Sequence, residues 1–195
     1  MSGLPGSGKT RVIEALYGES KATILDLDAE ICRHVDYDES EAAKIYESME
    51  AYNWADAVVE AKFRRSIADD KIRVIVVDGT GTKVDRRLRR IAAAKHHGLA
   101  TVLLYVNVTI ETALRRNERR RRVVPEDRLR DYRALSEIAR ERVAPAVDCY
   151  EVINNDVDVP DRDDQIAAMR RDANLRPCVL NTTSYRRRRR RRRRQ

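Results

Sequence analysis

The feature that most constrains this chain is a glycine-rich segment near its start, Gly3-Leu4-Pro5-Gly6-Ser7-Gly8-Lys9-Thr10. It fits the pattern G-x-x-x-x-G-K-[S/T] in full, with one more glycine inside the variable part. In such a loop, backbone N–H groups surround the phosphates of a nucleotide, and the helix that follows turns its positive end toward them. Glycine is needed where a side chain would block this approach or where φ is positive. The segment therefore predicts a nucleotide-binding loop, followed by a helix over residues 11–17.

Each part of this loop has an expected ligand. Lys9 is placed to reach the β- and γ-phosphates of ATP, and the hydroxyl of Thr10 is placed to hold Mg²⁺. We expect the nucleotide to be bound by the loop residues, which are Gly3, Pro5, Gly6, Ser7, Gly8, Lys9 and Thr10. Such a loop normally follows a buried central strand, but only Met1 and Ser2 precede Gly3 here. We therefore expect this first strand to be truncated and the natural start to lie upstream, because a missing central strand leaves its neighbours without hydrogen-bond partners.

The rest of the chain alternates between strand and helix patterns. Short apolar runs predict strands at Thr23–Leu27, Ile72–Val77, Thr101–Val106 and Tyr150–Ile153. Between them, apolar residues at helical spacing predict helices. This alternation predicts an α/β protein with the three-layer P-loop NTPase fold, in which a parallel sheet is flanked by helices.

Capping signals set the expected ends of these helices. The first helix after the loop helix covers 41–69, with a break near Asn53 and Ser40 as its N-cap. A capping box at 82–85 opens a helix that runs to about His97 and stops at Gly98. Thr109 opens an arginine-rich helix that ends before Pro125. The remaining helices are expected at Glu126–Val143 and Asp163–Arg171.

The basic character of the chain is concentrated in its last residues. Arg186–Arg194 is a run of nine arginines, and removing their charge from the net charge of +8 leaves −1 for the rest. Nine adjacent like charges repel one another and bury nothing, so we predict one folded domain over 1–172 and a disordered tail over 173–195. The tail either binds nucleic acid or another polyanion through residues 186–194 or has no such role.

The sequence also bears on where the protein works. No apolar run is long enough to cross a membrane, and no signal peptide precedes the glycine-rich loop. The three cysteines, Cys32, Cys149 and Cys178, are far apart and have no metal-ligand spacing. We expect them to be reduced and the protein to be cytoplasmic.

Aspartates follow two of the predicted strands, at the edge where ligands bind in open parallel sheets. Asp78 ends an apolar strand, as a Walker B carboxylate does, and is our candidate for orienting Mg²⁺. The alternative is an aspartate that caps a turn or helix. Asp28 is our candidate to accept a proton from an attacking hydroxyl. Asp26 competes for this role, but strand alternation places it on a different side, beneath the loop.

Arginines supply the candidate anion-binding groups. Arg116 and Arg120 are four residues apart in the cluster 115–122, so we expect them to share one helix face. A mobile lid over about 109–125 would bring both to the phosphates. The alternatives are a charged surface helix and a nucleic-acid-binding cluster. Arg33, about one turn after Asp28, either binds an anionic substrate or is solvated.

From Gly3 to about Asp156, the chain resembles the P-loop kinases of the polynucleotide kinase and zeta-toxin group. The segments that carry the resemblance are the loop at 3–10, Asp28, Val-Val-Asp-Gly-Thr at 76–80, Arg116-Asn117 with Arg120, and Val124-Pro125-Glu126. The resemblance implies ATP and Mg²⁺, a catalytic Asp28, and a lid that carries Arg116 and Arg120. The chain departs from polynucleotide kinases at Gly79 and Gly81, where they have asparagines, and in the longer spacing from Asp28 to Arg33.

The motifs and the resemblance lead to one expected activity. We expect an ATP-dependent phosphotransferase, a kinase in which Lys9, Asp28, Arg116 and Arg120 are catalytic. Its acceptor is a polynucleotide 5′-hydroxyl, a nucleotide sugar or another small alcohol, and the sequence does not choose among them. The alternatives are a P-loop NTP hydrolase and a nucleic-acid-binding module with an inactive loop.

Overall fold

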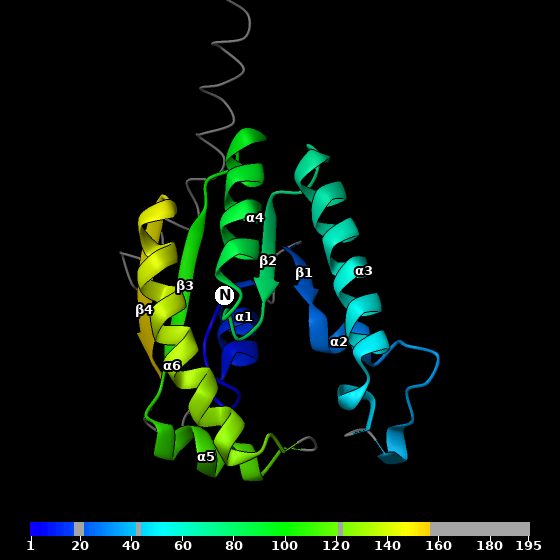
Figure 1. Cartoon of the computed structure of the whole chain (residues 1–195). Helices are drawn as coiled ribbons and strands as arrows, with labels where there is room; N and C mark the ends of the chain where they lie inside the picture. The colour runs from blue at the N-terminus through cyan, green and yellow to red at the C-terminus, as the bar shows by residue number, and fades with distance from the viewer. Residues whose placement is uncertain (18–21, 42–43, 121–122, 157–195) are drawn as a thin grey trace, which may run out of the picture.

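The structure is a computed structural model that describes residues 1–17, 22–41, 44–120 and 123–156 (Figure 1). The predicted helix at Asp163–Arg171, the predicted domain boundary at residue 172 and the arginine tail all lie outside the described residues.

Four parallel strands confirm the predicted sheet, each within two residues of its expected ends. They are β1 (Ala22–Asp26), β2 (Val74–Asp78), β3 (Val102–Asn107) and β4 (Cys149–Asn154). β1 pairs with β2, and β3 pairs with β4. All four strands end toward the same edge, where α5 lies (Figure 1). Groups that directly follow the strands are therefore brought to one place, although they are far apart in the sequence.

The first two residues lie between the two strand pairs. Ser2 forms an isolated parallel bridge with Tyr105 of β3, in which Ser2 N donates to Leu104 O at 2.8 Å and Ser2 O accepts from Val106 N at 2.8 Å. On the other side, the amino group of Met1 donates to Val77 O at 2.9 Å. The order β1, β2, Met1–Ser2, β3, β4 is that of a P-loop fold whose central strand is represented by two residues.

Six α-helices are found among the described residues, and they cover both sides of the strands. They are α1 (Lys9–Tyr17), α2 (Leu27–Ile31), α3 (Met49–Ala68), α4 (Val84–His96), α5 (Ile110–Glu118) and α6 (Glu126–Val143). Val12 of α1 packs on Val106 and Ile153 of β3 and β4, whereas α3 and α4 pack on Leu25 of β1. In Figure 1, α4 and α6 lie in front of the strands and α1 lies behind them, which gives the three expected layers.

The start of α3 differs from the prediction. Short 3-10 helices at Glu39–Glu41 and Lys44–Glu47 precede it, and it begins at Met49 and runs through Asn53 without a break. The N-cap is Ser48, whose hydroxyl accepts a hydrogen bond from Ala51 N at 3.2 Å. Ser40 does not cap the helix, because its hydroxyl donates to Asp38 Oδ1 at 2.7 Å instead. The exposed side chain of Asn53 disturbs no packing, so nothing interrupts the helix there.

Other helix ends were predicted with mixed success. Thr109 caps α5 by accepting from Thr112 N, Gly98 follows α4 with a φ of 76°, and α6 has the predicted bounds. The prediction of a capping box at 82–85 is wrong. The N-cap of α4 is Lys83, which makes no side-chain capping bond, and this shift by one residue takes Asp85 out of the position a capping box requires.

Two further observations concern the compartment predictions. Cys32 is an exposed free thiol, as expected, and Cys178 lies outside the described residues. Among the described residues, no helix combines the length and the apolar character that crossing a membrane requires.

Candidate active site

The glycine-rich loop leads from the Met1–Ser2 bridge into α1. It is tightened by a hydrogen bond from Ser7 N to Leu4 O at 3.0 Å. Gly6 and Gly8 have φ values of 84° and 86°, in the left-handed region that favours glycine. A Cβ on Gly6 would lie 2.7 Å from Ala113 O, and one on Gly8 would collide with Asn155 Nδ2. Both the backbone conformation and the available space therefore require glycine.

The side chain of Lys9 folds back over this loop. Its Nζ donates to Gly3 O at 3.0 Å and to Leu4 O at 3.1 Å. Burial lowers the pKa of Lys9, and Arg120 lowers it further, while nearby aspartates act in the opposite direction. The structure thus brings Lys9 within electrostatic reach of the groups that the sequence placed at the site: Asp28, Asp78 and Arg120, together with Asp26.

The last residues of β1 and β2 are both aspartates, and they face each other. Asp26 is the register partner of Asp78 in the parallel pair, so the two side chains leave the same side of the sheet. Burial raises the pKa of Asp26, and the charges of Asp78 and Asp28 raise it further. Strand alternation does not separate Asp26 from Asp28: residues two apart in a strand share a face, and β1 ends at Asp26, so Asp28 already belongs to α2.

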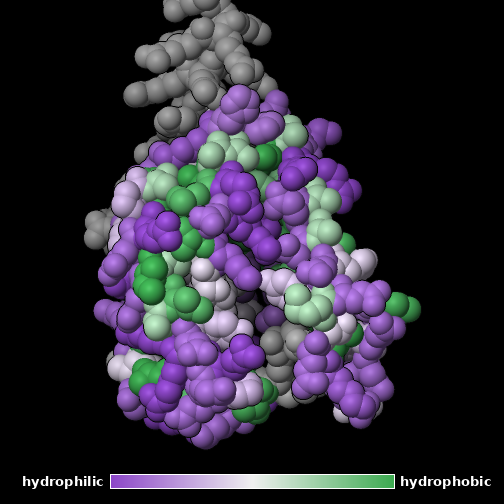
Figure 2. Space-filling model, in the orientation of Figure 1, coloured by the Kyte–Doolittle hydropathy of each residue, from purple (hydrophilic) through white to green (hydrophobic). Residues whose placement is uncertain are grey.

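Asp28 lies in the first turn of α2. Its backbone N donates to Asp26 Oδ1 at 2.9 Å, so Asp26 is the N-cap of this helix. The residue is exposed, and its charge acts on both Lys9 and Asp26. In Figure 2 the surface is hollowed near the ends of β1 and β2. The candidate proton acceptor is therefore accessible beside the loop.

The donor set fits Mg²⁺. Thr10 is exposed at the start of α1, and Asp78 accepts from Gly79 N through one oxygen, Oδ1, at 2.8 Å. Among the described residues, no group of three acidic, histidine or cysteine side chains forms a metal cage. Mg²⁺ is usually held by one or two carboxylates plus substrate phosphates, and a hydroxyl with one carboxylate suits that arrangement. Burial is the main cause of the raised pKa of Asp26, and the charges of Asp78 and Asp28 add to it; a divalent cation nearby would oppose that second contribution.

The two lid arginines have different environments. α5 ends at Glu118, and Arg120 lies beyond it, where its N donates to Asn117 O at 3.0 Å. The prediction that Arg116 and Arg120 share one helix face is therefore wrong. Asn117 ends the helix by bonding across the turn to Val124, with Nδ2 donating to Val124 O at 2.7 Å and Oδ1 accepting from Val124 N at 3.1 Å.

Arg116 and Arg120 also have different partners. The charge of Arg120 acts on Lys9, whereas Arg116 Nη1 donates to Asn155 O at 2.7 Å. Arg33 has a third environment. It pairs with Glu30 at 3.1 Å with its side chain 65% exposed, and Lys62 Nζ donates to the same Glu30 at 2.6 Å. Among the contacts of the described residues, none joins Arg33 to the loop.

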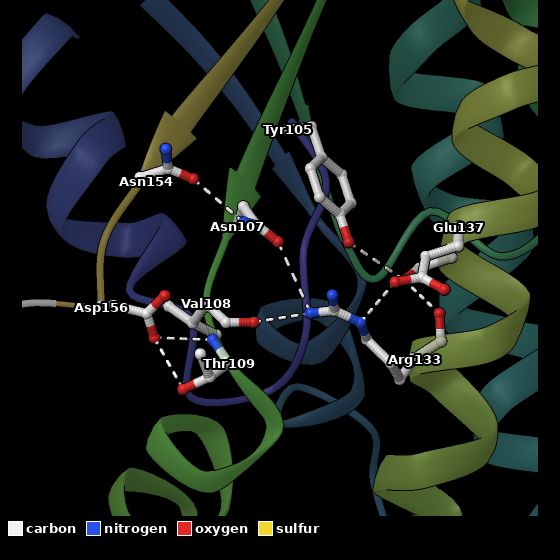
Figure 3. A network of polar contacts seen from close by, with 9 residues as sticks. Tyr105, Asn107, Val108, Thr109, Arg133, Glu137, Asn154 and Asp156 are labelled. Carbon is white, nitrogen blue, oxygen red and sulfur yellow. Dashed lines mark hydrogen bonds and ion pairs between the residues drawn. The ribbon is translucent and has the colours of Figure 1, made fainter.

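Polar residues at the ends of β3 and β4 and directly after them form a network that sequence reasoning missed (Figure 3). Asn107 Nδ2 donates to Asn154 Oδ1 at 3.0 Å, and Asp156 Oδ1 accepts from Thr109 N at 2.6 Å. Arg133 of α6 donates to Val108 O at 2.6 Å. Between Asn154 and Asp156, Asn155 Nδ2 donates to Ser7 O of the loop at 2.7 Å. The only sequence signal was the run Asn154-Asn155-Asp156 at the end of a predicted strand.

Comparisons with known proteins agree with this architecture. Residues 1–139 match the family described as "AAA domain". A shikimate kinase from Acinetobacter baumannii, solved in complex with shikimate, has a TM-score of 0.54 and 18% identity, with 92% of this chain and 91% of that chain covered. A shikimate kinase from Bacteroides thetaiotaomicron has a TM-score of 0.50 and 17% identity, with 87% and 93% covered. No curated protein sequence matches the chain significantly.

The resemblance to the polynucleotide kinase and zeta-toxin group stays a prediction. The broader prediction of a P-loop fold is confirmed by the matched family and by the fold shared with the two solved structures. At these identities the structural likeness establishes the fold, while the family match extends over most of the chain. The chain therefore belongs to the AAA domain family and has the P-loop NTPase-like fold, with parallel strands flanked by helices.

Proposed function

We propose that the protein is a kinase that transfers the γ-phosphoryl group of Mg·ATP to an acceptor hydroxyl. The observation that carries this proposal is the convergence on Lys9: the charges of Asp26, Asp28, Asp78 and Arg120 all act on its amine at the edge where β1 and β2 end. A phosphoryl transfer site needs this combination of cations around the transferred group with a carboxylate beside it.

The nucleotide side of the proposed site is the loop with the start of α1. Backbone N–H groups and the positive end of α1 bind the phosphates. Lys9 Nζ exchanges its bonds to Gly3 O and Leu4 O for phosphate oxygens. Thr10 and Asp78 are the residues that would hold Mg²⁺, directly or through water, and a bound ion would supply positive charge for the phosphates. Arg120, on the proposed lid at about 109–125, stabilises the charge of the transition state.

The acceptor side is assigned to Asp28. The acceptor oxygen forms its bond to the γ-phosphorus as the bond from that phosphorus to the β–γ bridging oxygen breaks, and ADP leaves. The hydroxyl proton passes to the carboxylate of Asp28, which is exposed in the first turn of α2 and therefore accessible to an alcohol. Arg33 is kept as a candidate for an anionic acceptor, which requires it to exchange Glu30 for the substrate.

The acceptor class is left to experiment. The candidates are a polynucleotide 5′-hydroxyl, a nucleotide sugar and a small alcohol. The structurally similar A. baumannii enzyme was solved with shikimate, which therefore joins the candidates. Binding of nucleic acid through residues 186–194 is a separate prediction, and deleting residues 186–195 separates such binding from a substrate site.

The test is transfer of label from γ-labelled ATP to a panel of these acceptors. We expect Mg²⁺-dependent labelling of one class and a loss of at least about 10²-fold in Lys9→Ala, as for removal of one charge-stabilising donor. Lys44→Ala is the matched control, because Lys44 pairs with Glu41 at 2.5 Å on an exposed 3-10 helix. Equal labelling by Lys9→Ala and wild type, or no Mg²⁺-dependent ATP binding by the wild type, would contradict the proposal.

A further inference from the structure

Asn155 is the one described residue after β4 whose side chain contacts the phosphate loop. It is 7% exposed and lies directly after the last residue of β4. Its Nδ2 donates to Ser7 O at 2.7 Å, and the same atom occupies the space that a Cβ on Gly8 would need. Asn155 therefore packs on the loop at the peptide unit that joins Ser7 to Gly8.

The contact between Asn155 and Ser7 O also fixes the direction of the Gly8 N–H in the loop. Ser7 O and the N–H of Gly8 belong to one planar trans peptide group, so they point in opposite directions. By holding Ser7 O on the side of β4, Asn155 fixes the Gly8 N–H toward the opposite side of the loop. Gly8, with a φ of 86°, has little intrinsic preference for either orientation of its flanking peptide units, so the amide of Asn155 supplies the restraint.

The backbone of Asn155 is itself held from two directions. Its N donates to Asn107 O at 2.9 Å, which continues the pairing of β3 and β4 by one residue. Its carbonyl oxygen accepts from Arg116 Nη1 of α5 at 2.7 Å. The next residue, Asp156, accepts from Thr109 N and Thr109 Oγ1 at 2.6 and 2.8 Å, at the start of the same helix. The position of Asn155 thus depends on both β3 and α5.

We propose that Asn155 is a positioning residue, whose side-chain amide orients the Gly8 N–H for phosphate binding and couples the shape of the loop to the position of α5. Its effect on nucleotide affinity rests on the proposed function, namely that the loop binds a triphosphate. Its effect on the loop itself does not. Arg116 acts in this scheme through the carbonyl of Asn155 and not on the phosphates.

The test compares the same substitution at two adjacent positions. Asn155→Asp keeps the size of the side chain but replaces the donor with an oxygen that repels Ser7 O. Asn154→Asp makes the same change in charge one residue earlier, on an exposed side chain whose Oδ1 accepts from Asn107 and whose replacement still accepts. Two quantities are measured with folded protein: the Kd of Mg·ATP and of inorganic tripolyphosphate by calorimetry, and amide hydrogen exchange at Gly8 without ligand.

We expect Asn155→Asp to bind both ligands about 10- to 100-fold more weakly, the loss expected when a buried carbonyl loses its donor. Gly8 should exchange faster in this variant, whereas Asn154→Asp should match the wild type in both measurements. Equal affinity and equal exchange in Asn155→Asp would overturn the inference, as would an equal loss in Asn154→Asp. Should Asn155→Asp not fold, Asn155→Ala replaces it.

The exchange measurement separates this inference from the proposed function. A wild type that binds neither ATP nor tripolyphosphate contradicts the proposed function, and faster Gly8 exchange in Asn155→Asp then still supports the positioning role. A wild type that binds ATP, together with unchanged exchange and affinity in Asn155→Asp, rejects the positioning role alone.

Discussion

The β1–β2 pair and the β3–β4 pair reach the same edge of the molecule with different chemistry. The first pair ends in the paired aspartates Asp26 and Asp78. Burial raises the pKa of Asp26, and the charges of Asp78 and Asp28 raise it further. The second pair ends in facing asparagines, Asn107 and Asn154, which bond to each other at 3.0 Å. The β1–β2 end of the site therefore holds carboxylates that repel one another, whereas the β3–β4 end holds neutral side chains that are hydrogen-bonded to each other.

This difference suggests a division of roles across the phosphate loop. In the proposed function, the groups that would meet a cation and a reacting hydroxyl lie on the β1–β2 side, where a bound cation would relieve the repulsion between the carboxylates. Groups that hold the loop and α5 lie on the β3–β4 side, where satisfied bonds restrict movement. Five substitutions test whether the two halves separate in this way. Three are assayed with Mg·ATP and the acceptor that the labelled-ATP panel identifies, and two are assayed by thermal unfolding.

Arg120→Ala should have the largest effect. The charge of Arg120 acts on Lys9, so we expect kcat to fall by about 10³–10⁵-fold, the range for arginines that stabilise phosphoryl transfer. Steady-state kinetics measure this. Arg130→Ala is the control, because Arg130 pairs with Glu126 at 2.6 Å on an exposed face of α6. An unchanged kcat in Arg120→Ala would remove Arg120 from the site.

Asp28→Asn should come next. Loss of a positioned proton acceptor is expected to lower kcat by about 10²–10⁴-fold while the Kd of Mg·ATP changes little. Steady-state kinetics measure the change in kcat, and calorimetry measures the Kd of Mg·ATP. Asp38→Asn, at an exposed aspartate that accepts from Ser40, is the matched control. A large loss of ATP affinity with little change in kcat would instead assign Asp28 to the metal.

Arg116→Ala should have a smaller effect of a different kind. Since Arg116 bonds to the backbone of Asn155, we expect Mg·ATP binding to weaken by about 3- to 10-fold, the effect of one lost hydrogen bond, with kcat nearly unchanged. The comparison with Arg120→Ala in the same assays is the measurement. If both variants lose kcat to the same extent, both arginines act on the phosphates and the two halves are not separate.

Asp26→Asn should produce the smallest change, a gain of a few degrees in Tm for the ligand-free protein at pH 7. Folding raises the pKa of Asp26, so deprotonation costs stability as pH rises through the unfolded and folded values. The full cost is present at neutral pH and vanishes below about pH 3, under the unfolded pKa. Thermal unfolding at both pH values measures the gain, and no gain at pH 7 would contradict the crowding of charge.

Asp148→Asn should change Tm in the opposite direction, and Asp148 lies at the other end of the sheet, just before β4. Partial burial acts to raise the pKa of Asp148, but hydrogen bonds from Thr101 and Lys95 lower it below the usual range. Its contribution to stability is therefore present above the unfolded pKa and lost as pH falls through the folded pKa. We expect Asp148→Asn to lower Tm at pH 7, so that the two aspartate variants move in opposite directions.

The bounds of a helix were predicted well where the residues that start it lie within a few positions of one another. α6 has the predicted bounds, because Pro125 and the acidic residues after it fix the start of the helix. The same reasoning failed at α3, where the sequence pointed to Ser40 as the N-cap. In the folded chain Ser40 bonds to Asp38 and the helix is capped by Ser48, which depends on contacts that the local pattern does not contain.

The sequence alone determined the conformation of the phosphate loop and the alternation of strands and helices, because glycine sterics and residue periodicity act over short distances. Tertiary structure decided which side chains meet. It placed Asp26 against Asp78 through strand register, turned Arg116 to Asn155, and joined Asn155 to Ser7 across 148 positions of the chain. Such contacts depend on how elements pack, and no local pattern encodes the partner of a side chain so far away in sequence.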